Sequence, residues 1–322
     1  MSEYHIDEAQ YKRIDAIRTQ SADELFALPN VTGLAVDKRM VRGQTTEELA
    51  LVVFVSKKCD VESERAVPRN IAGIRTDVQV GLLNPPEESD ADFEEDRAAI
   101  DRRRYDPIKG GCSVGAVWSG TSTSRATAGT LGVVVNDRSN GALVLLSNEH
   151  VLRPVFNSDD PVYQPAFGDD TNHQNKIGKQ VRALRTRLID AAIAGIDPSI
   201  DRTIRKSEVI GIGKIRGTAG IALGGAVMKR GRSTGLTQGF VIDKNFFCIT
   251  PLGHRFDGQL LVQEKNHGIF SHPGDSGALL VALPHHPHAV GLHHAGLHKQ
   301  GGEIQGVASP IAEVTRRMNI KF

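Results

Sequence analysis

A serine lies in a glycine-rich turn in the last fifth of the chain, in the segment His-Pro-Gly-Asp-Ser-Gly at 272–277. An attacking hydroxyl needs an exposed position, and the oxyanion that its attack creates needs two backbone N–H groups directed at one point. Gly274 and Gly277 allow a tight turn there. The apolar run at 278–283 is typical of a buried strand. Ser276 is therefore a candidate nucleophile, although an ordinary turn between strands has the same residues.

A serine hydroxyl is a weak nucleophile without a base, and the chain offers 12 histidines. His150 differs from the others because it follows an apolar run at 143–146 and a short polar turn at 147–149. A strand that ends in such a turn would present the imidazole at the strand's end. We predict that His150 is the base, and we expect the other histidines to be surface or core residues.

A third group, a buried carboxylate, is needed to hold the imidazole in one tautomer. Asp190 lies inside the apolar stretch 187–194, where an unpaired charge would be costly. We predict that it pairs with His150. Asp197 and Asp201 follow in a loop and are expected to act in turns, but either would replace Asp190 if the strand register were different.

His150, Asp190 and Ser276 follow one another at separations of 40 and 86 residues. In order and spacing, residues 107–315 resemble the trypsin-like serine peptidases, which have the chymotrypsin fold. The glycine-rich segments 110–115 and 227–239 are similar to an intracellular plant and bacterial group of that family, which includes the rice narrow-leaf protein.

The resemblance implies a role for each matching position. Ser276 would be the nucleophile, His150 the general base and then the acid, and Asp190 the orienting carboxylate. The backbone N–H groups of Gly274 and Ser276 would form the oxyanion hole, and Asp275 would have a structural role near the turn.

The substrate pocket implied by the resemblance would include Phe270 and the strand residues His294, Ala295 and Gly296, where a histidine side chain could narrow the pocket or contact substrate. Phe270 takes the position, six before the serine, at which trypsin has an aspartate, so a preference for Arg or Lys is not implied.

About a hundred residues precede the barrels, which argues against activation by a newly cleaved N-terminus. The basic residues Lys229, Arg230 and Arg232 are interpreted as a solvated strand face.

The predicted fold is mainly β, with two antiparallel six-stranded β-barrels of the chymotrypsin type, a small α+β part before them and a helix at the C-terminus. Three regions are expected: an N-terminal domain at 1–83 for regulation or assembly, a charged linker or short solvated helix at 84–106, and the protease domain at 107–322. Helical spacing marks the beginning of the chain and a proline begins the last helix, with strands expected between them. The expected helices are 7–27 and 310–319, and the expected N-terminal strands are 31–36, 49–55 and 76–80.

Composition narrows the class of protein. The formal net charge of the 322 residues is +1, which argues against an electrostatic grip on nucleic acid. The three cysteines are too few and scattered for a disulfide framework, and no signal sequence or long apolar run is present, so we expect a cytoplasmic protein without membrane contact. The histidines at 285–298 have no accompanying Cys or carboxylate ligand pattern, and we predict no metal and no other cofactor.

The sequence thus favours a serine endopeptidase that cuts a protein or peptide substrate through an acyl-enzyme. The extra N-terminal region makes an activating protein partner and a homo-oligomer candidates as well. The alternative is a pseudoprotease or scaffold that uses the cleft between the barrels as a protein-recognition module.

Overall fold

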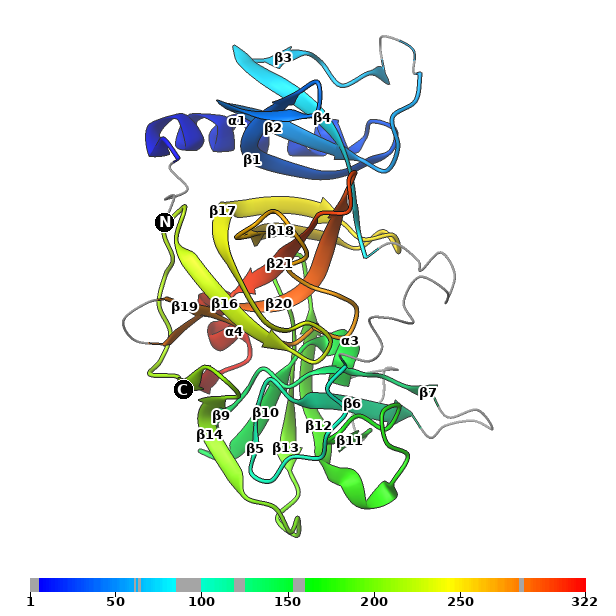
Figure 1. Ribbon diagram of the computed structural model, residues 1–322, viewed down its shortest axis with the longest axis vertical. Helices are drawn as coiled ribbons and strands as arrows, with labels where there is room; N and C mark the ends of the chain where they lie inside the picture. Colours follow the sequence, from blue (N-terminus) through cyan, green and yellow to red (C-terminus); the bar gives the residue numbers. More distant parts are fainter. Residues whose placement is uncertain are drawn as a thin grey trace.

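The computed structural model describes residues 6–60, 62, 65–84, 100–118, 125–152, 160–283 and 287–322. Figure 1 shows three tiers along the long axis, with the N-terminal elements at one end and two β-barrels below them. The barrel formed second in the sequence lies in the middle tier, between the N-terminal elements and the first barrel.

The first barrel is a closed ring of antiparallel strands. Going around it, β6 pairs with β8, β9 with β10, β10 with β13, β13 with β12, β12 with β11, and β11 again with β6. Between β8 and β9, the Leu131 N–H donates to the Cys112 carbonyl, just before β6, and the Gly132 N–H donates to the Leu146 carbonyl of β10. β8 and β9 therefore act as one interrupted strand. The elements in this part of the chain are β5 (Ile108–Gly110), β6 (Ser113–Trp118), β7 (Arg125–Ala126), β8 (Gly129–Thr130), β9 (Val133–Asp137), β10 (Leu143–Ser147), α3 (Glu149–Leu152), β11 (Pro161–Tyr163), η2 (His173–Asn175), β12 (Lys176–Arg185), β13 (Asp190–Ile196), β14 (Ile204–Val209) and β15 (Gly213–Lys214). Of these, β5, β14 and β15 form a separate three-stranded sheet.

The second barrel closes in the same way, in the order β16, β19, β20, β21, β18 and β17, with β17 paired again to β16. The prediction of two six-stranded antiparallel barrels is confirmed by this pairing, and so is the closing helix α4, with proline just before it. The strands of the second barrel are β16 (Ala226–Gly231), β17 (Gly235–Ile249), β18 (Arg255–Glu264), β19 (Leu279–Ala282), β20 (His288–Lys299) and β21 (Ile304–Pro310). After α4 (Ile311–Arg317), the last strand, β22 (Ile320–Lys321), pairs with β9 of the first barrel.

The N-terminal part combines one helix with strands, as predicted. Its elements are α1 (Glu8–Phe26), β1 (Val31–Val41), β2 (Gln44–Val55), β3 (Asn70–Ile71) and β4 (Ile74–Leu83). β1 pairs with β17 and β4 pairs with β20, so these strands extend the sheet of the second barrel. The division at residues 83 and 106 stays a prediction, but the first region is hydrogen-bonded to the third.

A buried ion pair attaches α1 to the second barrel. The guanidinium of Arg18 donates to the carboxylate of Asp243 on β17, and both side chains are fully buried. The same carboxylate accepts from the Tyr11 hydroxyl at 2.6 Å and from the Val36 N–H at 2.8 Å. The Asp243 carboxylate therefore links α1 and β1 to β17 through hydrogen bonds.

The Arg18→Met variant should lose about 3–5 kcal/mol of unfolding free energy, because it leaves the Asp243 carboxylate buried without its cation. Urea unfolding measures the change. Lys12→Ala is the matched control on the same helix: its ion pair with Glu8 is long, at 3.9 Å, and exposed, so the loss should stay below about 1 kcal/mol. Equal losses for the two variants would contradict the anchoring role of Asp243.

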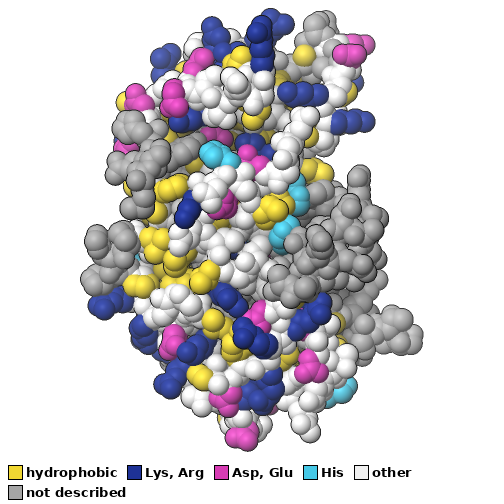
Figure 2. All heavy atoms as spheres, viewed as in Figure 1, with side chains coloured by type: hydrophobic (Ala, Val, Ile, Leu, Met, Phe, Trp, Pro, Cys, Tyr) yellow, Lys and Arg dark blue, Asp and Glu magenta, His cyan; other side chains and the backbone are white. Residues whose placement is uncertain are grey.

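The predicted linker, 84–106, is described at Asn84 and from residue 100 onward. Asp101 is buried and accepts from the Arg230 guanidinium at 2.6 Å, and its N–H donates to the carbonyl of Arg232. The last part of this region thus packs on the protein and is not a solvated spacer. The acidic run at 87–96 lies outside the described residues. Elsewhere, Figure 2 shows Lys/Arg and Asp/Glu side chains interspersed on one face of the molecule.

Candidate active site

The His150 and Asp190 side chains form a direct pair at the edge of the first barrel. β10 ends at Ser147, and the short helix α3 that follows carries His150. Asp190 is the first residue of β13, and its Oδ2 lies 2.7 Å from His150 Nδ1. Because an ionised carboxylate can only accept, this bond places the proton on Nδ1 and leaves Nε2 as the acceptor nitrogen of a neutral ring.

The carboxylate of Asp190 is 1 % exposed and is held from several sides. Oδ1 accepts from the Glu149 N–H at 2.6 Å, and the Asn148 amide donates to the Asp190 carbonyl at 2.6 Å. Burial alone would raise the pKa of this carboxyl, but the adjacent His150 ring and the more distant Arg185 hold the pKa well below its usual value. Asp190 is therefore a fixed anion behind the imidazole.

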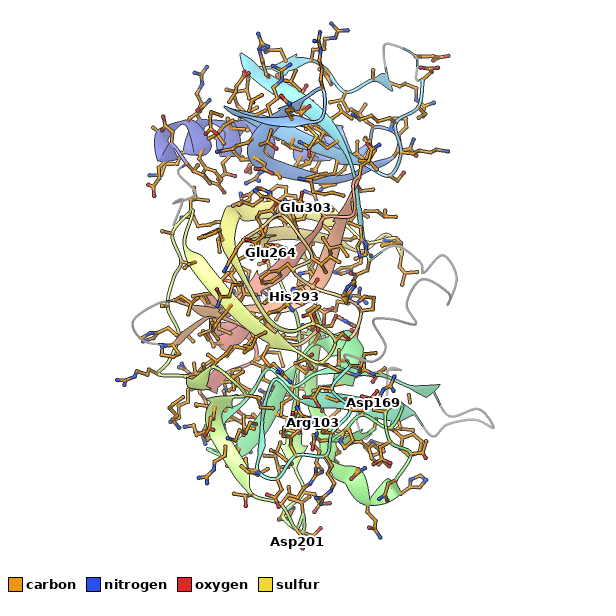
Figure 3. The ribbon with its side chains drawn as sticks, in the orientation of Figure 1. Arg103, Asp169, Asp201, Glu264, His293 and Glu303 are labelled. Carbon is orange, nitrogen blue, oxygen red and sulfur yellow. The ribbon has the colours of Figure 1, made fainter. Side chains whose placement is uncertain are left out.

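The two alternative carboxylates lie elsewhere. Asp197 accepts from the N–H and hydroxyl of Ser199, which is the turn role expected for it. Asp201 is exposed, and Figure 3 labels it at the far end of the first barrel. Among the described residues, His150 has a hydrogen bond to Asp190 and to neither of these.

The turn that carries Ser276 has the backbone that its glycines suggested. Gly274 has φ +97° and Gly277 has φ +96°, values that residues with a Cβ rarely adopt. A Cβ on Gly277 would also lie 2.1 Å from the carbonyl oxygen of Thr130. The predicted glycine requirement is met at both positions.

Within this turn, the backbone N–H groups divide into two sets. Those of Asp275, Gly277 and Ala278 donate to the carbonyls of His272, His293 and Asp275, respectively. Those of Gly274 and Ser276 donate to no acceptor among the described residues. The unused pair is the one assigned to an oxyanion hole, and a substrate oxygen would supply the acceptor that it needs.

Ser276 lies where the two barrels meet. Its carbonyl accepts from the Thr130 N–H at 2.7 Å, and a Cβ on Gly129 would touch both that carbonyl and the side chain of Val151, the residue after His150. The Ser276 hydroxyl donates to the carbonyl of His294 at 3.2 Å, and no bond to His150 occurs among the described residues. Bonds between a nucleophile and its base are often long or poorly aligned before substrate binds.

The residue before the nucleophile belongs to a second buried ion pair. Asp275 accepts from the Lys229 ammonium at 2.8 Å and from the Thr234 hydroxyl at 2.6 Å, and both charged side chains are fully buried. Its carboxylate also accepts three backbone N–H groups, from His272, Ser233 and Thr234. Asp275 thus ties the turn to β16 and the hairpin after it, as the structural role predicted for it requires.

The interpretation of the basic cluster as a solvated face was wrong. Lys229 is completely buried on Asp275, and Arg232 is largely buried and donates to Asp169 of the first barrel at 2.8 Å. Figure 3 labels Asp169 on the first barrel and His293 within the second. The alternation of side chains between the two faces of β16 could have predicted this burial, because Val227, Lys229 and Gly231 all lie on the buried face.

All four residues assigned to the substrate pocket are buried. Phe270 is fully buried in the core of the second barrel, with the Lys229 ammonium 5.1 Å from its ring centre. The His294 imidazole is 2 % exposed and bonds to Gln259 at 3.0 Å, so what it offers near Ser276 is its backbone carbonyl. Ala295 and Gly296 follow on β20.

Burial also governs the charge state of these histidines. Desolvation lowers the pKa of His294 to about 3, with His150 and Arg185 adding to the effect, and it lowers the pKa of His293 well below its usual value. Both rings are neutral at physiological pH.

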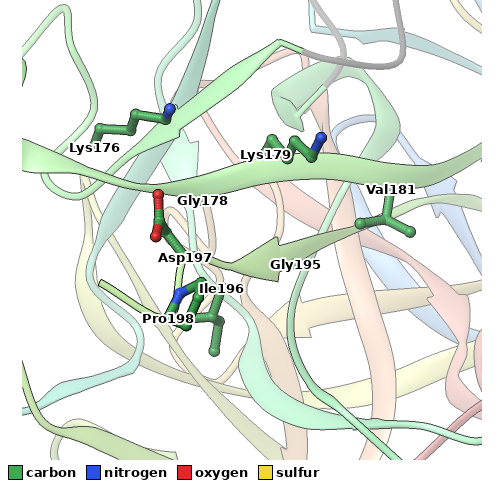
Figure 4. A pocket seen from close by; sticks show the side chains of 8 residues that line it. All are labelled: Lys176, Gly178, Lys179, Val181, Gly195, Ile196, Asp197 and Pro198. Carbon is green, nitrogen blue, oxygen red and sulfur yellow. The ribbon is translucent and has the colours of Figure 1, made fainter. Parts of the chain in front are cut away.

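No three His, Cys, Asp or Glu side chains in the described part of the chain are arranged to hold a metal ion, and His285 and His286 lie outside that part. A surface pocket between β12 and β13, lined by residues such as Lys179, Val181 and Asp197, shares no residue with the site (Figure 4). No described helix combines the length and apolar character required to span a bilayer.

Comparison with known proteins gives matches among solved structures alone: no family model and no curated protein matches the chain. A glutamic-acid-specific serine protease, described as using a histidine triad in substrate binding, is 18% identical, with a TM-score of 0.48, over 66% of this chain and 99% of that one. Cellulomonas bogoriensis chymotrypsin is 17% identical with a TM-score of 0.47, over 67% and 98% of the two chains. Nocardiopsis protease is 16% identical with a TM-score of 0.47, over the same shares.

The structural neighbours are serine proteases of the chymotrypsin fold. At these identities and TM-scores, the role of each residue here rests on the geometry of this chain. The resemblance to the intracellular group with the narrow-leaf protein stays a prediction.

Proposed function

We propose that this chain is a serine endopeptidase that hydrolyses peptide bonds through an acyl-enzyme. The observation that carries the proposal is the convergence of three elements at the junction of the barrels: the Asp190–His150 pair, the Ser276 hydroxyl and two unused N–H groups. A nucleophile, an oriented base and a pair of oxyanion donors are what acyl transfer needs.

In the proposed reaction, the Ser276 hydroxyl rotates from the His294 carbonyl toward Nε2 of His150. The imidazole takes the hydroxyl proton while Oγ attacks the scissile carbonyl carbon, and the N–H groups of Gly274 and Ser276 bind the oxyanion. His150 then gives the proton to the leaving amine. Water, deprotonated by the same ring, hydrolyses the ester and frees Ser276.

A fluorophosphonate probe tests the proposal directly, because it reacts with activated serines irrespective of peptide sequence. Intact mass should show one adduct on the wild-type chain and none on Ser276→Ala or His150→Ala. Ser199→Ala, which removes an exposed hydroxyl on the first barrel, should label like the wild type. Failure of the wild type to react would favour the pseudoprotease alternative.

A further inference from the structure

One edge of β20 is divided into three successive parts. Residues 288–293 bond to β19 and the turn before it, and residues 297–299 pair with β4. Between them lie His294, Ala295 and Gly296, next to the candidate nucleophile, because the His294 carbonyl accepts from the Ser276 hydroxyl. This short stretch is the part of the edge at which an added strand would reach Ser276.

Asn84, at the end of β4, already occupies one end of this stretch. Its N–H donates to the Gly296 carbonyl at 2.9 Å, and its side-chain Oδ1 accepts from the Gly296 N–H at 2.7 Å. Both main-chain groups of Gly296 are therefore engaged by a single residue.

The spacing of hydrogen bonds along β20 indicates which residue of a bound peptide would compete with Asn84. Extended peptides bind enzymes and recognition domains by adding a strand to an exposed sheet edge, and alternate residues of a strand bond to the same edge. A peptide with its scissile carbonyl at Ser276 would donate to His294 from the residue before the cut. Running antiparallel to β20, as β4 does, it would meet Gly296 with the third residue before the cut.

We propose that Asn84 is a specificity-determining residue, which fills the Gly296 pairing site and competes there with the third residue of a peptide substrate. The inference rests on the proposed function. It implies that kcat/KM of the wild-type chain increases little when the substrate is extended beyond the second residue before the cut. The positive φ of Asn84, 35°, favours asparagine or glycine at this position, so the Asn84→Gly variant keeps the backbone conformation and removes the side-chain acceptor.

The test compares two blocked substrates, Ac-Xaa-p-nitroanilide and Ac-Ala-Ala-Xaa-p-nitroanilide, each with a mixture of residues at Xaa. The ratio of their kcat/KM values is the length gain. In Asn84→Gly the length gain should be about fivefold larger than in the wild type, because the freed Gly296 N–H can bond to the peptide. Asn84→Asp keeps an oxygen acceptor and should match the wild type. An equal length gain in the wild type and Asn84→Gly would overturn the inference.

Two further measurements separate this inference from the proposed function. The fluorophosphonate labelling rate should be the same in the wild type and Asn84→Gly, because the probe does not reach Gly296. In the Ser276→Ala background, a fluorescein-labelled Ala-Ala-Xaa peptide mixture should bind about fivefold more tightly once Asn84→Gly is added, by fluorescence anisotropy. Absence of labelling in both chains would refute the proposed function, whereas equal peptide affinities would refute the role of Asn84.

Discussion

The Asp190→Asn variant should lose roughly 10⁴-fold in the rate of acylation at pH 7 while it keeps its fold. An asparagine can present its NH₂ group to His150 Nδ1, where the carboxylate now accepts at 2.7 Å. The ring would then carry its proton on Nε2 and could not take one from Ser276. Fluorophosphonate labelling rates and kcat/KM on a blocked peptide measure the loss, and circular dichroism checks the fold.

Asp197→Asn is the matched control for this prediction. It makes the same chemical change in a first-barrel carboxylate that bonds to Ser199 and not to His150. Its labelling rate should stay within about twofold of the wild type, since surface changes away from a site have small effects. If Asp197→Asn lost activity and Asp190→Asn kept it, the assignment of the orienting carboxylate would be wrong.

The Lys229→Met variant should lose both stability and reactivity. Removal of the ammonium leaves the Asp275 carboxylate fully buried without its cation, which should cost about 3–5 kcal/mol in unfolding free energy. Asp275 also holds the hairpin at residues 233–234 against the turn that carries Gly274 and Ser276. We expect the labelling rate to fall by roughly 10²-fold, the effect of losing one oxyanion donor.

A second substitution makes this prediction specific. In Lys229→Met/Asp275→Asn the buried charge is gone, so the double variant should be more stable than Lys229→Met alone, by urea unfolding. Lys265→Met, an exposed lysine of the same barrel, should change stability by less than about 0.5 kcal/mol. Additive losses in the double variant would show that Lys229 and Asp275 do not stabilise each other.

The same ion pair sets a pH dependence. Burial alone would raise the pKa of Asp275, but Lys229 and the Thr234 hydroxyl lower it to about 2. Since the unfolded pKa is about 3.9, the pair contributes its stability above pH 4 and loses it as the pH falls from about 4 to 2. In Lys229→Met the loss of stability between pH 4 and pH 2 should be smaller than in the wild type, because without the cation burial raises the folded pKa of Asp275 and protonation no longer destabilises the fold as strongly. Urea unfolding at the two pH values measures the difference.

Much of the site could be predicted because its signals are local. A glycine-rich turn before an apolar run marked Ser276, and an apolar run before a polar turn marked His150. A carboxylate inside an apolar stretch marked Asp190, which has its predicted partner in the structure. The catalytic roles of the three residues stay predictions until the variants are measured.

The partners that lie far apart in the sequence were decided by the tertiary structure. Lys229 and Asp275 are 46 residues apart, and a lysine among basic neighbours favours solvent unless a buried anion faces it. Asn84 gave no signal, because its bond to Gly296 depends on β4 adding to the edge of β20. Local sequence patterns indicated a strand-rich chain and the candidate triad, whereas only the closed sheets determined the order of the strands and which backbone groups and buried charges meet around the triad.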